Sequence, residues 1–87
     1  MANHVSAAKR ARQIIKRTER NRAIRTRVRH AVKLARAAIE SGDAAAAKEP
    51  VAKASVLLAR AVTQGVLHKN AAARTISRVQ SAFARLG

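Results

Sequence analysis

The 87-residue sequence contains no cysteine, which excludes a disulfide framework, a thiolate nucleophile and a zinc site built from sulfur ligands. No apolar run approaches the roughly 18–20 residues of a membrane-spanning helix, and the N-terminus lacks the apolar block of a secretory signal. Its Arg-rich, acid-poor start is shared with mitochondrial transit peptides, but the same stretch supplies apolar residues that a core needs. We therefore expect one domain over residues 1–87, near the lower size limit for folding on a single core.

Acidic residues are also scarce, which argues against an enzyme. The only acids are Glu19, Glu40, Asp43 and Glu49, and Asp43 alone lies in an expected turn, where a helix-capping role explains it better. The histidines share no metal-ligand spacing, and the glycines stand singly rather than in a glycine-rich phosphate loop. We expect no catalytic site, no metal and no cofactor.

Glycine and proline are absent from residues 1–41, so nothing interrupts a helix over residues 6–40. Such a helix is about 52 Å long at a rise of 1.5 Å per residue. A compact chain of this length has a radius of gyration of only about 12 Å. Part of the helix is therefore expected to project from the body of the protein.

Gly42 and Asp43 predict the boundary between the first two helices. Gly42 suits the left-handed position that ends a helix, and Asp43 is a good N-cap for a second helix over residues 44–64. Pro50 removes one backbone hydrogen bond of that helix and crowds the preceding turn. We expect a kink or a restart of the helix at this residue.

Gly65 is expected to close the second helix, and Asn70 to cap a third over residues 70–86. The buried stripe predicted for the third helix consists of Ala73, Ile76, Val79, Gln80, Phe83 and Leu86. Short connections make successive helices antiparallel neighbours, and no alternating run long enough for a strand occurs. The sequence predicts an all-α fold: a three-helix antiparallel bundle with a long, projecting, basic N-terminal helix.

The two halves of the first helix carry their apolar residues on different sides. From residue 24 onward one face holds Ile24, Val28, Ala31, Val32, Ala35, Ala38 and Ile39, and the opposite face holds Arg22, Arg25, Arg29, Lys33 and Arg36. Before residue 20 the pattern rotates by about half a turn at 100° per residue. A straight helix cannot present both stripes to one partner, so we expect only the C-terminal half to pack on the bundle.

Basic residues dominate the charge of the chain. Lys and Arg number 19 against four acids, a formal net charge of +15. Residues 1–36 hold 12 of these bases and one acid, a formal charge of +11. Such asymmetry indicates a nucleic acid or an anionic membrane as partner.

Cations recur at one-turn intervals along the first helix. Arg25, Arg29 and Lys33 are spaced i, i+4, i+8, with Asn21 one turn ahead and Arg17 before it. Like charges at i, i+4 destabilise a helix by ~0.2–0.5 kcal/mol per pair, so this ladder favours an external counter-charge. Phe83 is the only aromatic residue, which excludes proteins that stack bases on aromatic platforms. We expect phosphate and shape recognition of double-stranded or compactly folded RNA.

A second candidate contact is the turn at residues 65–74. With Asn70 as its cap, the third helix would direct backbone N–H groups outward as a phosphate seat, and Lys69 and Arg74 would add two cations. A plain capped turn without a ligand explains the same residues equally well.

Several short motifs together resemble the bacterial small-subunit ribosomal protein S-twenty family. These are Gly-x-x-His-Lys-Asn-x-Ala-Ala-Arg at 65–74, Met1-Ala2-Asn3 with Ser6-Ala7 and Lys9-Arg10, the Asn21/Arg25/Arg29 ladder, and Gly42-Asp43. The resemblance spans the whole chain. It implies a three-helix bundle that binds 16S ribosomal RNA directly, chiefly in the 5′ domain, assists early assembly of the small subunit and has no enzymatic activity.

The resemblance also assigns RNA contacts and a location. It gives this role to Lys9, Arg10, Asn21, Arg25, Arg29, His68, Lys69, Asn70 and Arg74, and the basic faces add Lys16, Arg17, Arg22 and Lys33. Val5, Ala8 and Ile14 depart from positions that are often basic or polar in relatives. The implied protein is cytoplasmic, on the ribosome, and a monomer when free.

Two rival interpretations share the charge of this chain. A nucleoid-type DNA-binding protein would usually need a dimer seam or a recognition helix, and the sequence indicates neither. A membrane-surface peptide would need Trp, Phe or Leu on its apolar face, where residues 7–15 offer mostly Ala. We expect no membrane partner and no small-molecule substrate.

Overall fold

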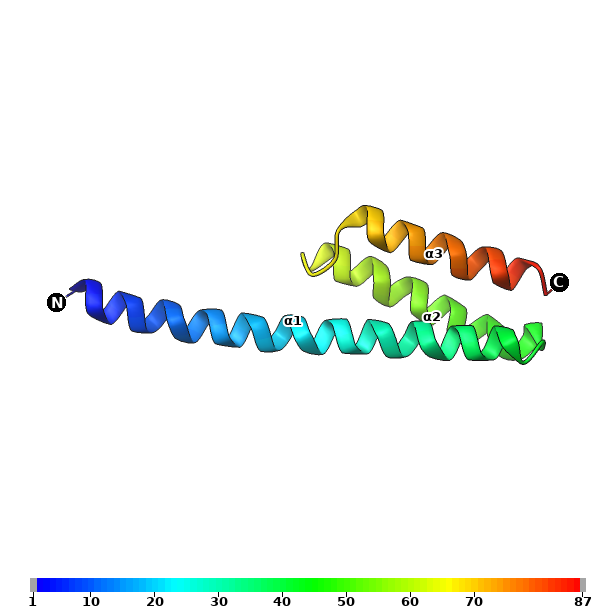
Figure 1. Ribbon diagram of the computed structural model, residues 1–87, viewed down its shortest axis with the longest axis horizontal. Coiled ribbons are helices and arrows are strands. Elements are labelled where there is room, and N and C mark those ends of the chain that lie inside the picture. The colour runs from blue at the N-terminus through cyan, green and yellow to red at the C-terminus, as the bar shows by residue number, and fades with distance from the viewer. Residues whose placement is uncertain (1, 87) are drawn as a thin grey trace.

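Three helices form the computed structural model, which describes residues 2–86, with side chains from residue 6 onward. They are α1 (Ala2–Glu40), α2 (Ala44–Thr63) and α3 (Lys69–Ala84), and the described residues include no strand. α1 runs the full length of the molecule, and α2 and α3 lie along its C-terminal half only (Figure 1). The all-α prediction with a long first helix is confirmed.

The molecule is elongated because α1 outruns its partners. Its extents are 65 × 20 × 13 Å and its Cα radius of gyration is 17.7 Å. A compact chain of this length would have about 12 Å. α1 begins four residues before the predicted start, and its N-terminal half projects from the bundle (Figure 1).

The turn between α1 and α2 forms as the sequence predicts. Gly42 has a φ of 81°, a left-handed conformation that a residue with a Cβ rarely adopts. The Asp43 carboxylate accepts hydrogen bonds from the backbone N–H groups of Ala45 and Ala46, at 3.0 and 3.3 Å. These bonds satisfy two of the N–H groups that have no partner within α2.

α2 continues through Pro50 without interruption. The missing N–H of Pro50 leaves one hydrogen bond of the helix unmade, yet the helical turns on both sides persist. The buried residues Ala47 and Val51 flank Pro50 and hold this part of α2 against the core. The helix therefore does not restart at Pro50, and a kink there stays a prediction.

α3 begins one residue before the predicted start and uses a different cap. His68 is the N-cap, with extended backbone angles, and its Nδ1 accepts a hydrogen bond from the Asn70 N–H at 3.1 Å. Asn70 lies inside the first turn, so its predicted role as the cap is wrong. Gly65, with a φ of 75°, ends α2 as predicted.

The core consists of small apolar side chains in two adjoining clusters. One contains Ile24, Val28, Leu58, Ala61, Val66 and Ala72, and the other contains Ala31, Ala35, Ala47, Val51, Ala54 and Val79. Half of these residues are Ala, which lets helix backbones approach closely. α2 packs most extensively against α1 and less against α3, while α1 and α3 touch least. This uneven packing leaves a gap between α1 and α3.

Candidate nucleic-acid interface

The N-terminal half of α1 has no partner within the chain. Every side chain from residue 6 to residue 20 is exposed, and the first buried one is Ile24. The predicted contact residues of this segment, Lys9, Arg10, Lys16 and Arg17, therefore all face solvent. We call residues 6–20 the free half of α1 and residues 21–40 the bundle half.

The free half carries cations where the bundle half carries its core. Arg10 and Arg17 precede Ile24 and Ala31 by steps of seven residues, which keeps all four on nearly the same side of a helix. Ile24 and Ala31 are buried against the bundle. Two arginines on the same side exclude an apolar partner there and favour an anionic one.

The ladder winds around α1 rather than running straight along it. A step of four residues advances about 6 Å along a helix and turns about 40° around it. Arg22, Arg25, Arg29 and Lys33 are exposed, whereas Asn21 is half-buried and its Oδ1 is buried without a hydrogen-bond partner. Asn21 therefore lies at the edge of the core, and the exposed cations lie outside it.

The turn before α3 exposes its four predicted contact residues, His68, Lys69, Asn70 and Arg74. The His68 ring accepts the Asn70 N–H, so this N–H is not available to a phosphate. The Arg74 Nε–H donates to the Asn70 carbonyl at 3.4 Å, which holds this side chain along the start of α3. The phosphate seat expected here thus has fewer backbone donors than the sequence suggested, while its cations are accessible.

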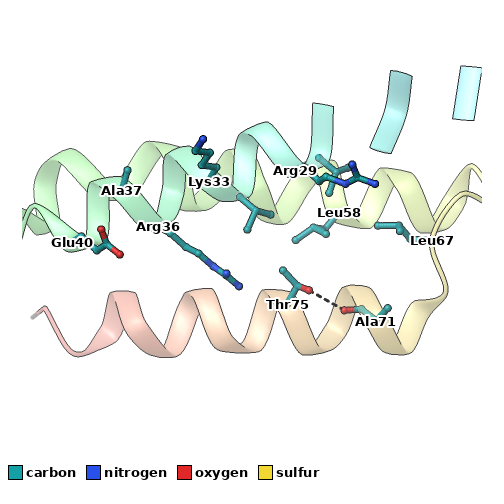
Figure 2. Close-up of a pocket in the computed structure, with 11 residues that line it drawn as sticks. Arg29, Lys33, Arg36, Ala37, Glu40, Leu58, Leu67, Ala71 and Thr75 are labelled. Carbon is teal, nitrogen blue, oxygen red and sulfur yellow. Dashed lines mark hydrogen bonds between the residues drawn. The ribbon is translucent and has the colours of Figure 1, made fainter. Parts of the chain in front are cut away.

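A groove of about 650 Å³ lies between α1 and α3. Its floor is apolar and consists of Val28, Val32, Leu58 and Leu67, and its α3 side presents Ala71 and Thr75. Three cations line the α1 side, namely Arg29, Lys33 and Arg36, with Glu40 at one end (Figure 2). We call this feature the α1–α3 groove.

The groove joins two regions that are separate in the sequence. Arg29 and Lys33 belong to the predicted ladder, and Leu67 and Ala71 flank the predicted turn. Arg36 lies on the predicted basic face but is not among the predicted contacts. Its one-turn spacing after Lys33 is the signal that would have included it.

Two other kinds of feature, a metal site and a membrane-spanning helix, do not occur among the described residues. They contain no group of three or more His, Cys, Asp or Glu side chains placed to hold a metal ion. Among the described helices, none has an apolar stretch long enough to cross a membrane.

An all-α fold with an exposed, projecting basic helix is typical of small proteins that bind structured nucleic acid. Residues 2–84 match the family model of ribosomal protein S20, and the chain belongs to this family.

Curated relatives resemble the chain over nearly its whole length. The small ribosomal subunit protein bS20 of Wolinella succinogenes is 46% identical over 86 residues, covering 99% of this chain and 94% of the relative. The bS20 protein of Maridesulfovibrio salexigens is also 46% identical, with 99% of both chains covered. That of Solidesulfovibrio magneticus is 49% identical over 82 residues, which are 94% of this chain and 92% of the relative.

Proposed function

We propose that this protein binds small-subunit ribosomal RNA directly, chiefly in the 5′ domain, as a structural component during early assembly. The observation that carries the proposal is the free half of α1, fifteen consecutive exposed residues with cations on several sides. A helix with this charge and no partner in its own chain is suited to lie between RNA phosphates.

The predicted contacts form three groups in this proposal. The free half supplies Lys9, Arg10, Lys16 and Arg17, the ladder supplies Asn21, Arg22, Arg25, Arg29 and Lys33, and the turn supplies His68, Lys69, Asn70 and Arg74. Arg is well suited to this role because its planar guanidinium matches two phosphate oxygens at once. Phosphate and sugar contacts, rather than stacking on aromatic rings, give the binding energy.

Two further properties complete the proposal. The free protein is a monomer, as the resemblance implies, and its formal net charge of +15 disfavours self-association. The protein has no enzymatic activity, which agrees with family membership and with its few acidic side chains.

The test compares RNA fragments at one salt concentration. Filter binding measures the affinity of the full chain for transcripts of the 16S 5′ domain and of the 3′ domain, with duplex DNA of equal length as the control. We expect the 5′-domain transcript to bind at least about tenfold more tightly than the 3′-domain transcript or the DNA. Specific nucleic-acid affinities typically exceed non-specific ones by a much larger factor. Equal affinities for all three would contradict the proposal, and sedimentation of the free protein tests the monomer.

A further inference from the structure

The floor of the α1–α3 groove is not what a phosphate interface requires. Val32 and Leu67 remain half-buried there, and Leu58 lies beneath them. Phosphate oxygens gain nothing from contact with aliphatic carbon, whereas an apolar body that covers this floor removes its remaining surface from water. The occupant that fits the groove therefore has an apolar part.

The rim of the groove requires an anionic part as well. Arg29, Lys33 and Arg36 line it, against the single carboxylate of Glu40. On the α3 side, the Thr75 hydroxyl donates its hydrogen to the Ala71 carbonyl at 3.1 Å, so its oxygen is left as an acceptor. A nucleotide combines these three properties, since it has an anionic phosphate, a base with largely apolar faces, and hydrogen-bond donors on the edge of that base.

The position of Arg36 decides between a nucleotide and a protein segment. Its side chain extends from α1 across the groove toward α3 (Figure 2). It therefore divides the groove, and a continuous helix of an acidic partner would have to displace it. A planar base fits beneath it, and an Arg guanidinium stacks well on an unpaired RNA base.

We propose that the α1–α3 groove binds one unpaired nucleotide of the RNA, a contact that rests on the proposed function. The base lies on the apolar floor beside Val32 and is covered by the guanidinium of Arg36. The adjoining phosphates lie toward Arg29 and Lys33. The groove thereby adds recognition of an unpaired base to an interface that otherwise contacts phosphates.

Two RNA hairpins with the same stem test this site, one fully paired and one with a single unpaired adenosine in the stem. Fluorescence anisotropy measures their affinities for the full chain at equal salt. We expect the bulged hairpin to bind about tenfold more tightly, near the lower end of what stacking of one base on an aromatic side chain contributes. Arg36→Lys keeps the positive charge but removes the planar guanidinium on which the base would stack. It should therefore abolish the preference for the bulged hairpin without changing the affinity for the paired hairpin.

A filled groove provides the second variant. Ala71 is exposed on the groove side of α3, and Ala71→Leu places extra carbon where the base would lie. Ala73→Leu adds the same side chain at an exposed position outside the groove and is the matched control. We expect the preference to disappear in the first variant and to persist in the second.

The outcomes separate the site from its alternatives. Equal affinity of the unaltered protein for both hairpins, or a preference that survives Arg36→Lys and Ala71→Leu, overturns the site while leaving phosphate binding intact. Absence of binding to either hairpin also overturns the site, whereas the proposed function fails only if the 16S 5′-domain transcript is not preferred. Adenosine monophosphate alone should bind at least about a hundredfold more weakly than the bulged hairpin, because it lacks the neighbouring phosphates. Tighter binding of the free nucleotide, or displacement of the RNA by an acidic helical peptide, assigns the groove to another ligand.

Discussion

Both halves of α1 contain apolar side chains, but only the bundle half buries them against other helices. In the free half Ile14 and Ile15 are 60% and 57% exposed, whereas Ile24 in the bundle half is 8% exposed. The difference arises because α2 and α3 lie along the C-terminal half of α1 only (Figure 1), and because the free half has fewer apolar side chains. The side that holds Ile24 against the bundle is occupied by Arg10 and Arg17 in the free half. One uninterrupted helix therefore serves two partners, its own chain and an anionic one.

The same substitution in each half should give the largest contrast. Ala35 is fully buried between helices and Ala11 is exposed. Ala35→Lys forces a long side chain and a charge into a close-packed site and should lower the free energy of unfolding by about 3 kcal/mol or more. Ala11→Lys should change it by less than about 0.5 kcal/mol. Urea denaturation followed by circular dichroism measures both free energies of unfolding. Equal losses in the two variants would contradict the division of α1 into a free half and a bundle half.

Amide hydrogen exchange should separate the halves in the unaltered protein. The free half has no tertiary contact and its cations repel one another, so in free solution it should fray and exchange rapidly. Amides in the bundle half should approach the protection set by global unfolding. Binding of RNA should protect the free half as it becomes a stable helix. Full protection of residues 7–20 in the free monomer would contradict this prediction.

Removal of one cation of the ladder should have a smaller and more specific effect. Arg25→Ala or Arg29→Ala should weaken RNA binding and reduce the salt dependence of log K by about 0.9, the value for one phosphate contact in the duplex limit. Both side chains are exposed, so the fold should stay intact. A salt titration of each variant measures the slope. An unchanged slope would show that these arginines face open water in the complex.

The turn before α3 should show the smallest effects, and they depend on charge. Asn70→Asp puts a carboxylate in the first turn of α3, where the helix dipole favours it, so stability should hold or rise while RNA binding weakens. Asn70→Ser is the neutral control and should bind RNA more tightly than the Asp variant. Lys69→Ala should weaken binding without unfolding the bundle. Equal RNA affinities of the Asp and Ser variants would make the turn purely structural.

The helix boundaries show what local chemistry can and cannot predict. Gly42 and Asp43 fix the end of α1 and the start of α2, because a left-handed backbone and a side-chain cap leave few alternatives. The start of α3 was misplaced because Asn is usually the stronger cap, yet the structure uses His68. The sequence could not show that the ring of His68 turns back onto the Asn70 N–H.

The buried stripe of α3 shows a second limit. The prediction chose Ala73, but Ala72 is buried and Ala73 is exposed. The run of three alanines at 71–73 has no contrast in hydrophobicity, so periodicity cannot select the inward one. Gln80 was also placed in the stripe, and the structure exposes it, with a hydrogen bond from its side-chain amide to the Ser55 hydroxyl at 3.3 Å.

Spacing predicted the contacts of the ladder, and the resemblance supplied those at Lys9, Arg10 and His68, but neither predicted how these residues are arranged. Periodicity placed Arg29 and Lys33 on the basic face, and both are exposed. It could not show that they border an apolar-floored groove, because the groove depends on how far α3 lies from α1. That distance is set by the packing of both helices on α2, a tertiary property with no local signal.

The projecting free half has a consequence for the lifetime of the protein. Trypsin-like proteases cleave after Lys and Arg but need a locally unfolded segment; the free half is rich in both residues and is expected to fray in the unbound chain. RNA that surrounds this half would cover those peptide bonds. We expect limited trypsin digestion to remove the N-terminal segment from free protein while the bundle and the RNA-bound chain survive. Degradation of unbound copies would then keep the amount of protein matched to the RNA available to receive it.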